Sequence, residues 1–277
     1  MRAEYKQFQY NKTTLAYLKS GNGAEPLLLF HGFGQNHSAF STLFEPLSKQ
    51  YTLYSFDLFF HGNSHWPLDE MPLSKDYWHE LLNQFLRENK IDKFSLLGFS
   101  LGAKFALTSF ESFPSRVNNV FLLAPDGIKT STWYSLATYP IALRALFKST
   151  ITKPGIFSAI VKIARGLNLI DQKVLKFSES QMQTEENRRR VYYSWVVFRH
   201  LHFDLKKMVS QFNASPASVL VLIGQFDKII TARNVQGFTS KVPRARLQVL
   251  VTGHNGLIKE SVEVLRKYER EKDQNSH

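Results

Sequence analysis

A chain of 277 residues, 43% of them hydrophobic and 21% charged, is long enough to bury a large core, and its mean hydropathy of -0.24 is typical of a soluble globular protein. This composition excludes an intrinsically disordered chain, and no apolar segment approaches the length of a membrane-spanning helix. Without cysteine, the chain cannot form disulfides, use a thiol nucleophile or bind zinc through thiolates.

The positive charge is concentrated in one part of the chain. The net charge is +12, and residues 127–210 contain 14 Lys and Arg against 5 Asp and Glu. One interpretation is a solvated basic surface, and another is attraction to an anionic membrane surface or an acidic substrate. No zinc-finger or RNA-binding signature accompanies the charge, so the sequence does not predict a nucleic-acid partner.

Short apolar segments predict a largely parallel sheet. The first twelve residues are polar and carry no hydrophobic signal segment, so the sequence predicts a cytoplasmic protein. Phe8–Tyr10 and Thr14–Tyr17 flank a polar turn and are expected to form a hairpin at the edge of the sheet. The further predicted strands are Pro26–Phe30, Thr52–Phe56, Lys93–Leu97, Asn119–Leu123, Val219–Ile223 and Leu247–Val251, all with the composition of buried strands.

Helical periodicity separates most of these strands. Apolar residues share a helix face in three segments, at Phe40/Leu43/Phe44/Leu47, Trp78/Leu81/Leu82/Phe85 and Ile258/Val262/Leu265. We expect all three faces to pack against the sheet. The polar C-terminal segment from Arg270 is predicted to be disordered.

The alternation of strands and helices stops after Asp126 and resumes near Ser218. The intervening sequence has much helical spacing and no strand pattern, so residues 127–210 are predicted to form a helical cap inserted into a core domain of residues 1–126 and 211–277. Within it, Ile156–Arg165 is apolar at helical spacing with interleaved cations. Such a helix either packs on the core domain or lies on a membrane surface through cations such as Lys162 and Arg165.

A serine lies between two glycines at a predicted turn from strand to helix. The sequence Gly98-Phe99-Ser100-Leu101-Gly102 follows the strand that ends at Leu97 and precedes a helix-like segment. Small residues two positions before and after a nucleophile are needed where the turn is so sharp that larger side chains would collide with neighbouring backbone. The motif predicts Ser100 as an exposed nucleophile.

Three other polar or glycine-rich segments also follow predicted strands. His31-Gly32-Phe33-Gly34 follows the first parallel strand, and its backbone N–H groups can face a substrate oxygen. Asp227 and His254 each follow one of the last two strands. A hydrolytic serine needs a base and a group that orients this base, and His254 and Asp227 are the candidates.

These residues resemble the α/β-hydrolase superfamily, in its capped branch of esterases and lipases. The chain order Ser100, Asp227, His254 is that of the family. The resemblance implies a mostly parallel central sheet flanked by helices, hydrolysis through an acyl-enzyme, and an oxyanion hole made by the backbone N–H groups of Phe33 and Leu101. It implies no cofactor and no metal ion.

The segment Asp57–Ser64 is similar to the family's D-x-x-G-x-G-x-S loop, with one departure. Phe60 replaces the first glycine, so we expect a bulkier loop that narrows the rim of the site. By the same resemblance, Asp57 supports the loop and has no catalytic role.

Two neighbouring charged residues need separate interpretations. Asp126 also follows a strand end and competes with Asp227 as the acid, but the Gly-x-x-Asp sequence favours Asp227. Lys104 lies one turn into the helix after Ser100, where it either reaches a substrate carboxylate or is solvated. We expect it to be solvated.

The sequence therefore predicts a serine hydrolase of carboxylic esters. The chain is 14% aromatic, and aromatic residues are frequent in the predicted cap, which favours a hydrophobic acyl group on a small ester substrate. Thioesterase chemistry remains open. So does carbon–carbon bond hydrolysis, for which Arg188, Arg189 and Arg190 are candidate acid-binding residues. A signalling receptor with slow turnover is a further alternative.

Overall fold

A single eight-stranded sheet forms the centre of the fold. The computed structural model describes residues 3–128, 132–166 and 179–274. In space the strands follow the order β1 (Glu4–Tyr10), β2 (Thr13–Ser20), β4 (Tyr51–Phe56), β3 (Glu25–Phe30), β5 (Phe94–Phe99), β6 (Val117–Leu123), β7 (Ser218–Gly224) and β8 (Ala245–Leu250). The hairpin β1–β2 and the pair β2–β4 are antiparallel, and all other neighbours are parallel, as expected from the short apolar segments.

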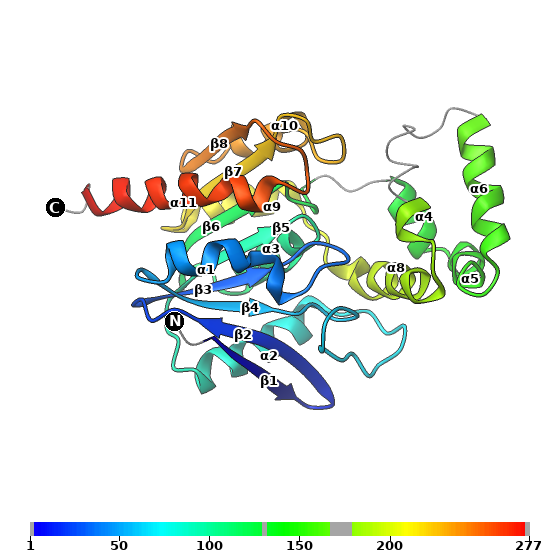
Figure 1. Ribbon diagram of the computed structural model, residues 1–277, viewed down its shortest axis with the longest axis horizontal. Helices are drawn as coiled ribbons and strands as arrows, with labels where there is room; N and C mark the ends of the chain where they lie inside the picture. Colours follow the sequence, from blue (N-terminus) through cyan, green and yellow to red (C-terminus); the bar gives the residue numbers. More distant parts are fainter. Residues whose placement is uncertain (1–2, 129–131, 167–178, 275–277) are drawn as a thin grey trace. The chain divides into compact units, whose positions relative to one another are not determined.

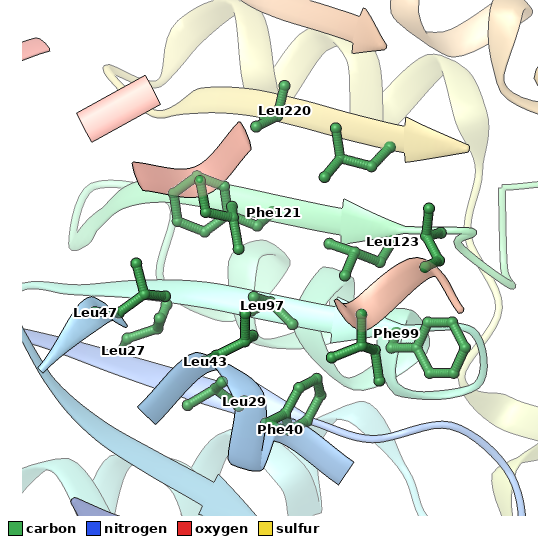
Figure 2. Packing of buried hydrophobic residues seen from close by; sticks show 14 of the residues in the cluster. Leu27, Leu29, Phe40, Leu43, Leu47, Leu97, Phe99, Phe121, Leu123 and Leu220 are labelled. Carbon is green, nitrogen blue, oxygen red and sulfur yellow. The ribbon is translucent and has the colours of Figure 1, made fainter. Parts of the chain in front are cut away.

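Helices cover both faces of this sheet. Along β3 the residues Leu27 and Leu29 face the cluster that includes α1 (Ser41–Leu47) and α11 (Leu257–Gln274), whereas Phe30 contacts the aromatic rings of the other face. This alternation follows from the two-residue period of a strand. Figure 2 shows Leu27 and Leu29 of β3 and Leu97 of β5 beside Leu43 and Leu47 of α1, and the same cluster includes Phe121 and Leu220 of the next two strands.

Aromatic rings fill the opposite face. Phe30 contacts Trp78 of α2 (Lys75–Glu88) and Phe105 of α3 (Gly102–Ser112). Phe110 of α3 stacks on Phe212 of α9 (Leu205–Ala214), which contacts α10 (Ala232–Thr239) through Phe238. The helix face predicted at Trp78 is buried, and so are Ile258 and Leu265 of the face predicted near the C-terminus.

The chain divides into two compact units. The first, Met1–Trp66, Lys75–Lys129 and His202–His277, contains the sheet, and the second comprises Pro67–Ser74 and Thr130–Leu201. The sequence predicts the cap as one continuous insertion of residues 127–210. The second unit ends earlier because residues from His202 onward belong with the sheet, and it also takes in Pro67–Ser74, whose Leu73 N–H donates to the carbonyl oxygen of Val197 (2.9 Å).

The regular elements in the described part of the second unit are helices. They are α4 (Thr132–Thr138), α5 (Ile141–Ser149), α6 (Pro154–Gly166), α8 (Glu185–Val197) and the short η2 (Phe198–His200). The labels and colours of these elements are given in Figure 1. A small core of Ile151, Tyr192 and Val196 joins α8 to the end of α5, and the Tyr134 hydroxyl donates to the carbonyl oxygen of Trp195 (2.9 Å).

Candidate active site

Ser100 lies at a sharp turn between β5 and α3. Its φ of 50° is in the left-handed region, and the turn is held by hydrogen bonds from the Ser100 N–H to the Leu123 oxygen (2.9 Å) and from the Asp126 N–H to the Ser100 oxygen (3.1 Å). A Cβ added to Gly98 would lie 2.6 Å from the Ala103 Cα, and one added to Gly102 would lie 1.9 Å from the Phe30 oxygen. The two glycines are thus required by close backbone approach, as the motif predicted.

The three predicted residues meet at the carboxyl ends of the parallel strands. His254 Nε2 lies 3.1 Å from Ser100 Oγ, and His254 Nδ1 lies 2.6 Å from Asp227 Oδ2. Ser100 follows β5, Asp227 follows β7, and His254 follows β8, which explains why residues so distant in sequence converge. The arrangement can take a proton from the serine hydroxyl at Nε2 while Nδ1–H donates to the carboxylate.

Asp227 is held as an ionised, fixed acceptor. It is buried, and its Oδ1 accepts hydrogen bonds from the backbone N–H groups of Ile229 (2.8 Å) and Ile230 (3.0 Å). Burial alone would raise the pKa of this carboxyl, but the hydrogen bonds from His254, Ile230 and Ile229 outweigh burial and leave the pKa below its ordinary value.

The rival acid, Asp126, makes a different contact. Its Oδ2 lies 3.4 Å from the Nζ of Lys104, and the link from Asp126 to Ser100 runs through its backbone N–H. The expectation that Lys104 is solvated is wrong, because its side chain is 7% exposed and forms this ion pair. The Lys104 side chain is thus buried, and Asp126 compensates its charge.

The two N–H groups predicted for an oxyanion hole make no hydrogen bond to another residue that the structure describes. In the loop after β3, the Gly32 N–H donates to Gln35 Oε1 (2.9 Å) and the Gly34 N–H donates to His61 Nε2 (2.9 Å). Throughout the described residues, neither the Phe33 nor the Leu101 N–H donates a hydrogen bond. A Cβ added to Gly102 would also lie 2.7 Å from the His31 oxygen, so this loop contacts the turn at Ser100. Both N–H groups are available to an external acceptor.

Two buried histidines that the sequence analysis did not assign hold this loop. His31 Nδ1–H donates to the Gly32 oxygen (2.7 Å), and Nε2 accepts from the Leu58 N–H (3.0 Å). His61 is 2% exposed, and its Nδ1–H donates to the Phe59 oxygen (3.0 Å). Each of these histidines precedes a glycine shortly after a strand, a signal that was visible in the sequence. They join the loop after β3 to the loop after β4.

The burial of the His31 imidazole predicts that the stability of the fold depends on pH. Complete burial lowers the pKa of His31 to about 4, against about 6.5 in the unfolded chain. Between these values the unfolded state binds the proton more strongly. The contribution of His31 to the free energy of unfolding is therefore present above pH 6.5 and is lost as pH falls toward 4. We expect this group alone to lower the unfolding free energy by about 2 kcal/mol between pH 7 and pH 5.

Urea unfolding at these two pH values measures the effect. In His31→Gln the free energy of unfolding should depend less on pH than in the wild type. In His65→Gln, which alters an exposed ring, the wild-type dependence on pH should be retained. An unchanged dependence in His31→Gln would contradict the assignment of His31 as the titrating group.

Asp57 organises the loop after β4, in agreement with the structural role predicted for it. Its oxygens accept hydrogen bonds from the Tyr5 hydroxyl (2.8 Å) and from the N–H groups of His37 (2.7 Å) and Asn63 (3.0 Å). Phe60, which replaces the family glycine, adopts a φ of 68°. It thus retains a backbone conformation that glycine adopts more easily. The narrowing of the rim by Phe60 stays a prediction.

Neither a metal site nor a membrane span was found in residues 3–128, 132–166 and 179–274. This part of the chain contains no group of three or more His, Cys, Asp or Glu side chains placed to hold a metal ion. None of its helices combines the length and apolar character required to cross a bilayer.

Comparisons with known proteins agree with this architecture. Residues 25–153 match the family model described as alpha/beta hydrolase fold. The chain is 31% identical over 116 residues to the 1-acylglycerol-3-phosphate O-acyltransferase ABHD5 of Rattus norvegicus, covering 41% of this chain and 33% of that protein. It is 31% identical over 115 residues to the (lyso)-N-acylphosphatidylethanolamine lipase of Homo sapiens, covering 38% and 32% respectively. The matched region thus spans about a third of the length of these relatives.

Solved structures extend the likeness to the whole chain. A thermophilic esterase from Thermogutta terrifontis superimposes with a TM-score of 0.68 over 100% of both chains, at 17% identity. At this identity the likeness concerns the fold. The sequence match over residues 25–153, the strand order and the shared architecture together show that the chain has the α/β-hydrolase fold.

Proposed function

We propose that this protein is a serine hydrolase that cleaves carboxylic esters with a hydrophobic acyl group. The observation that carries the proposal is the chain of hydrogen bonds from Ser100 through His254 to Asp227, at 3.1 and 2.6 Å. The same constellation of nucleophile, base and orienting acid serves acyl transfer on unrelated folds, so the argument rests on the site and not on the fold.

The reaction would proceed in two half-reactions. Ser100 Oγ attacks the ester carbonyl while His254 Nε2 takes the hydroxyl proton, and the Phe33 and Leu101 N–H groups stabilise the negative oxygen. The carbon–oxygen bond to the alcohol breaks, and His254 protonates the departing alcohol. Water then attacks the acyl-enzyme, His254 takes its proton and returns it to Ser100, and the carboxylic acid is released.

The acyl-enzyme also permits transfer to an acceptor other than water. One relative is named as an acyltransferase and another as a lipase, which favours keeping acyl transfer to an alcohol as a second candidate. The two reactions share the first half-reaction and differ only in the nucleophile that resolves the acyl-enzyme.

Carbon–carbon bond hydrolysis is less well supported. Of its candidate acid-binding residues, Arg188 is buried and donates to the carbonyl oxygens of Ile151 (2.8 Å), Met182 (3.1 Å) and Gln183 (3.1 Å). Arg189 and Arg190 pair with glutamates one helical turn earlier in α8. All three guanidinium groups therefore have partners within the second unit.

A panel of p-nitrophenyl esters and matching acyl thioesters of increasing chain length tests the proposal. We expect many turnovers per protein molecule and a kcat/KM that rises as the acyl chain lengthens, because burial of each methylene contributes about 0.8 kcal/mol. Adding an alcohol acceptor distinguishes transfer from hydrolysis by its product. A single slow turnover with every member of the panel would instead support a ligand-binding receptor.

A further inference from the structure

Helices α5 and α6 of the second unit expose large apolar side chains. None of the residues of α5 is buried. Ile141 is 77% exposed and Ile163 of α6 is 61% exposed, well above the values for apolar residues of a core. The other large apolar residues that are exposed in the described part of these helices are Leu143, Leu146 and Ile160. Several large exposed apolar side chains on two consecutive helices favour an interaction surface more than a single exposed residue does.

The charged residues of these helices and of the turns beside them are all positive. Residues 139–166 contain five Lys and Arg and neither Asp nor Glu. Arg144 and Lys148 both lie near Glu70, at 3.8 and 2.5 Å, and Arg165 pairs with Glu179 at 3.1 Å. Lys153 and Lys162 are exposed, and neither forms an ion pair with another described residue. We call these two lysines and the five exposed apolar residues the α5–α6 surface.

We propose that the α5–α6 surface binds the interface of an anionic lipid bilayer. Isoleucine and leucine side chains enter the boundary between headgroups and acyl chains, while the two lysines meet lipid phosphate and carboxylate groups. The combination of apolar and cationic residues without acidic ones is complementary to such a surface. Pairing with a second copy through this surface would place like charges opposite one another, which is unfavourable.

Binding through this surface is independent of the proposed hydrolysis. The surface lies wholly in the second unit, whereas Ser100, Asp227 and His254 lie in the first. Ser100→Ala is therefore expected to bind vesicles as the wild type does. Failure of vesicle binding and failure of ester hydrolysis can thus be told apart.

Cosedimentation of the full chain with vesicles tests the electrostatic part. The probes are vesicles of phosphatidylcholine alone and of phosphatidylcholine mixed with phosphatidylserine, at low and high salt. We expect binding to the anionic vesicles at low salt, weak binding to the neutral vesicles, and release as salt rises. The double variant Lys153→Gln/Lys162→Gln should bind the anionic vesicles about 30-fold more weakly.

The matched control removes two exposed lysines from the first unit. Lys12→Gln/Lys93→Gln changes the net charge by the same amount and should leave vesicle binding unchanged. Circular dichroism should show the wild-type fold for both double variants. Equal binding to anionic and neutral vesicles, absence of binding to either, or equal weakening in both lysine variants would each overturn the proposal.

The apolar part has its own variants. Ile141→Asp and Ile163→Asp place a carboxylate in the surface and should each abolish detectable binding to anionic vesicles while leaving turnover of a short soluble ester unchanged. Sedimentation velocity in the absence of lipid should give a monomer for the wild type and for both variants. A wild-type dimer that Ile163→Asp dissociates would assign the surface to self-association and would contradict the proposal.

Discussion

Ser100→Ala is expected to abolish labelling by a fluorophosphonate probe and to lower ester turnover by about four to six orders of magnitude. The hydroxyl of Ser100 lies 3.1 Å from His254 Nε2, so it is the group whose proton the imidazole can take, and the probe reacts with a serine activated in this way. Residual turnover in the variant would come from binding and from the Phe33 and Leu101 N–H groups alone.

A serine elsewhere on the first unit provides the control for labelling. Ser115 is exposed, and Ser115→Ala should be labelled once per molecule, as the wild type is. Both variants should unfold at the same urea concentration as the wild type, because neither substitution opens a cavity in the core. Undiminished labelling of Ser100→Ala would place the reactive serine elsewhere.

The sheet and the convergence of the candidate residues could be predicted because both depend on local patterns. Short apolar segments identify parallel strands, and polar residues directly after those strands gather at one edge of the sheet. Ser100, Asp227 and His254 meet there, within hydrogen-bond distance of one another. Their catalytic roles, and that of Phe33 and Leu101, stay predictions.

Contacts between distant segments account for what the sequence did not predict. The spacing of Lys104 in its helix carries no information about Asp126, which the end of β6 brings within 3.4 Å. The strand predicted at Leu247–Val251 is present as β8, but it lies at the edge of the sheet, where Leu247 is 37% and Val249 is 49% exposed. Its apolar sequence indicated a strand without indicating how much of it would be covered.

The C-terminal helix extends further than the sequence predicts. The sequence from Arg270 was predicted to be disordered, whereas α11 continues to Gln274. Glu271 lies 3.8 Å from Lys267 one turn earlier and 3.2 Å from Arg246 of β8. The first contact follows from i,i+4 spacing and was available in the sequence, and the second depends on the tertiary structure.

Asp227→Asn and Asp126→Asn separate the two candidate acids. Asp227 Oδ1 accepts two backbone N–H groups, so an asparagine at this position would keep its oxygen there and direct its amide N–H₂ toward His254 Nδ1. The imidazole would then carry its proton on Nε2 and could not take the proton of Ser100. We expect kcat to fall by about 10³- to 10⁴-fold, with the fold retained because the asparagine is isosteric.

Asp126→Asn is expected to change kcat by no more than about threefold, within the usual range for a side chain outside the reacting groups. Its carboxylate contacts Lys104 at 3.4 Å, and the hydrogen bond that supports the turn at Ser100 comes from the Asp126 backbone N–H, which the substitution preserves. Steady-state kinetics of both variants on one soluble ester, with unfolding curves recorded alongside, gives the ranking. A larger loss of kcat in Asp126→Asn than in Asp227→Asn would assign the orienting acid to Asp126, and the contact of 2.6 Å between His254 and Asp227 would then have to be structural.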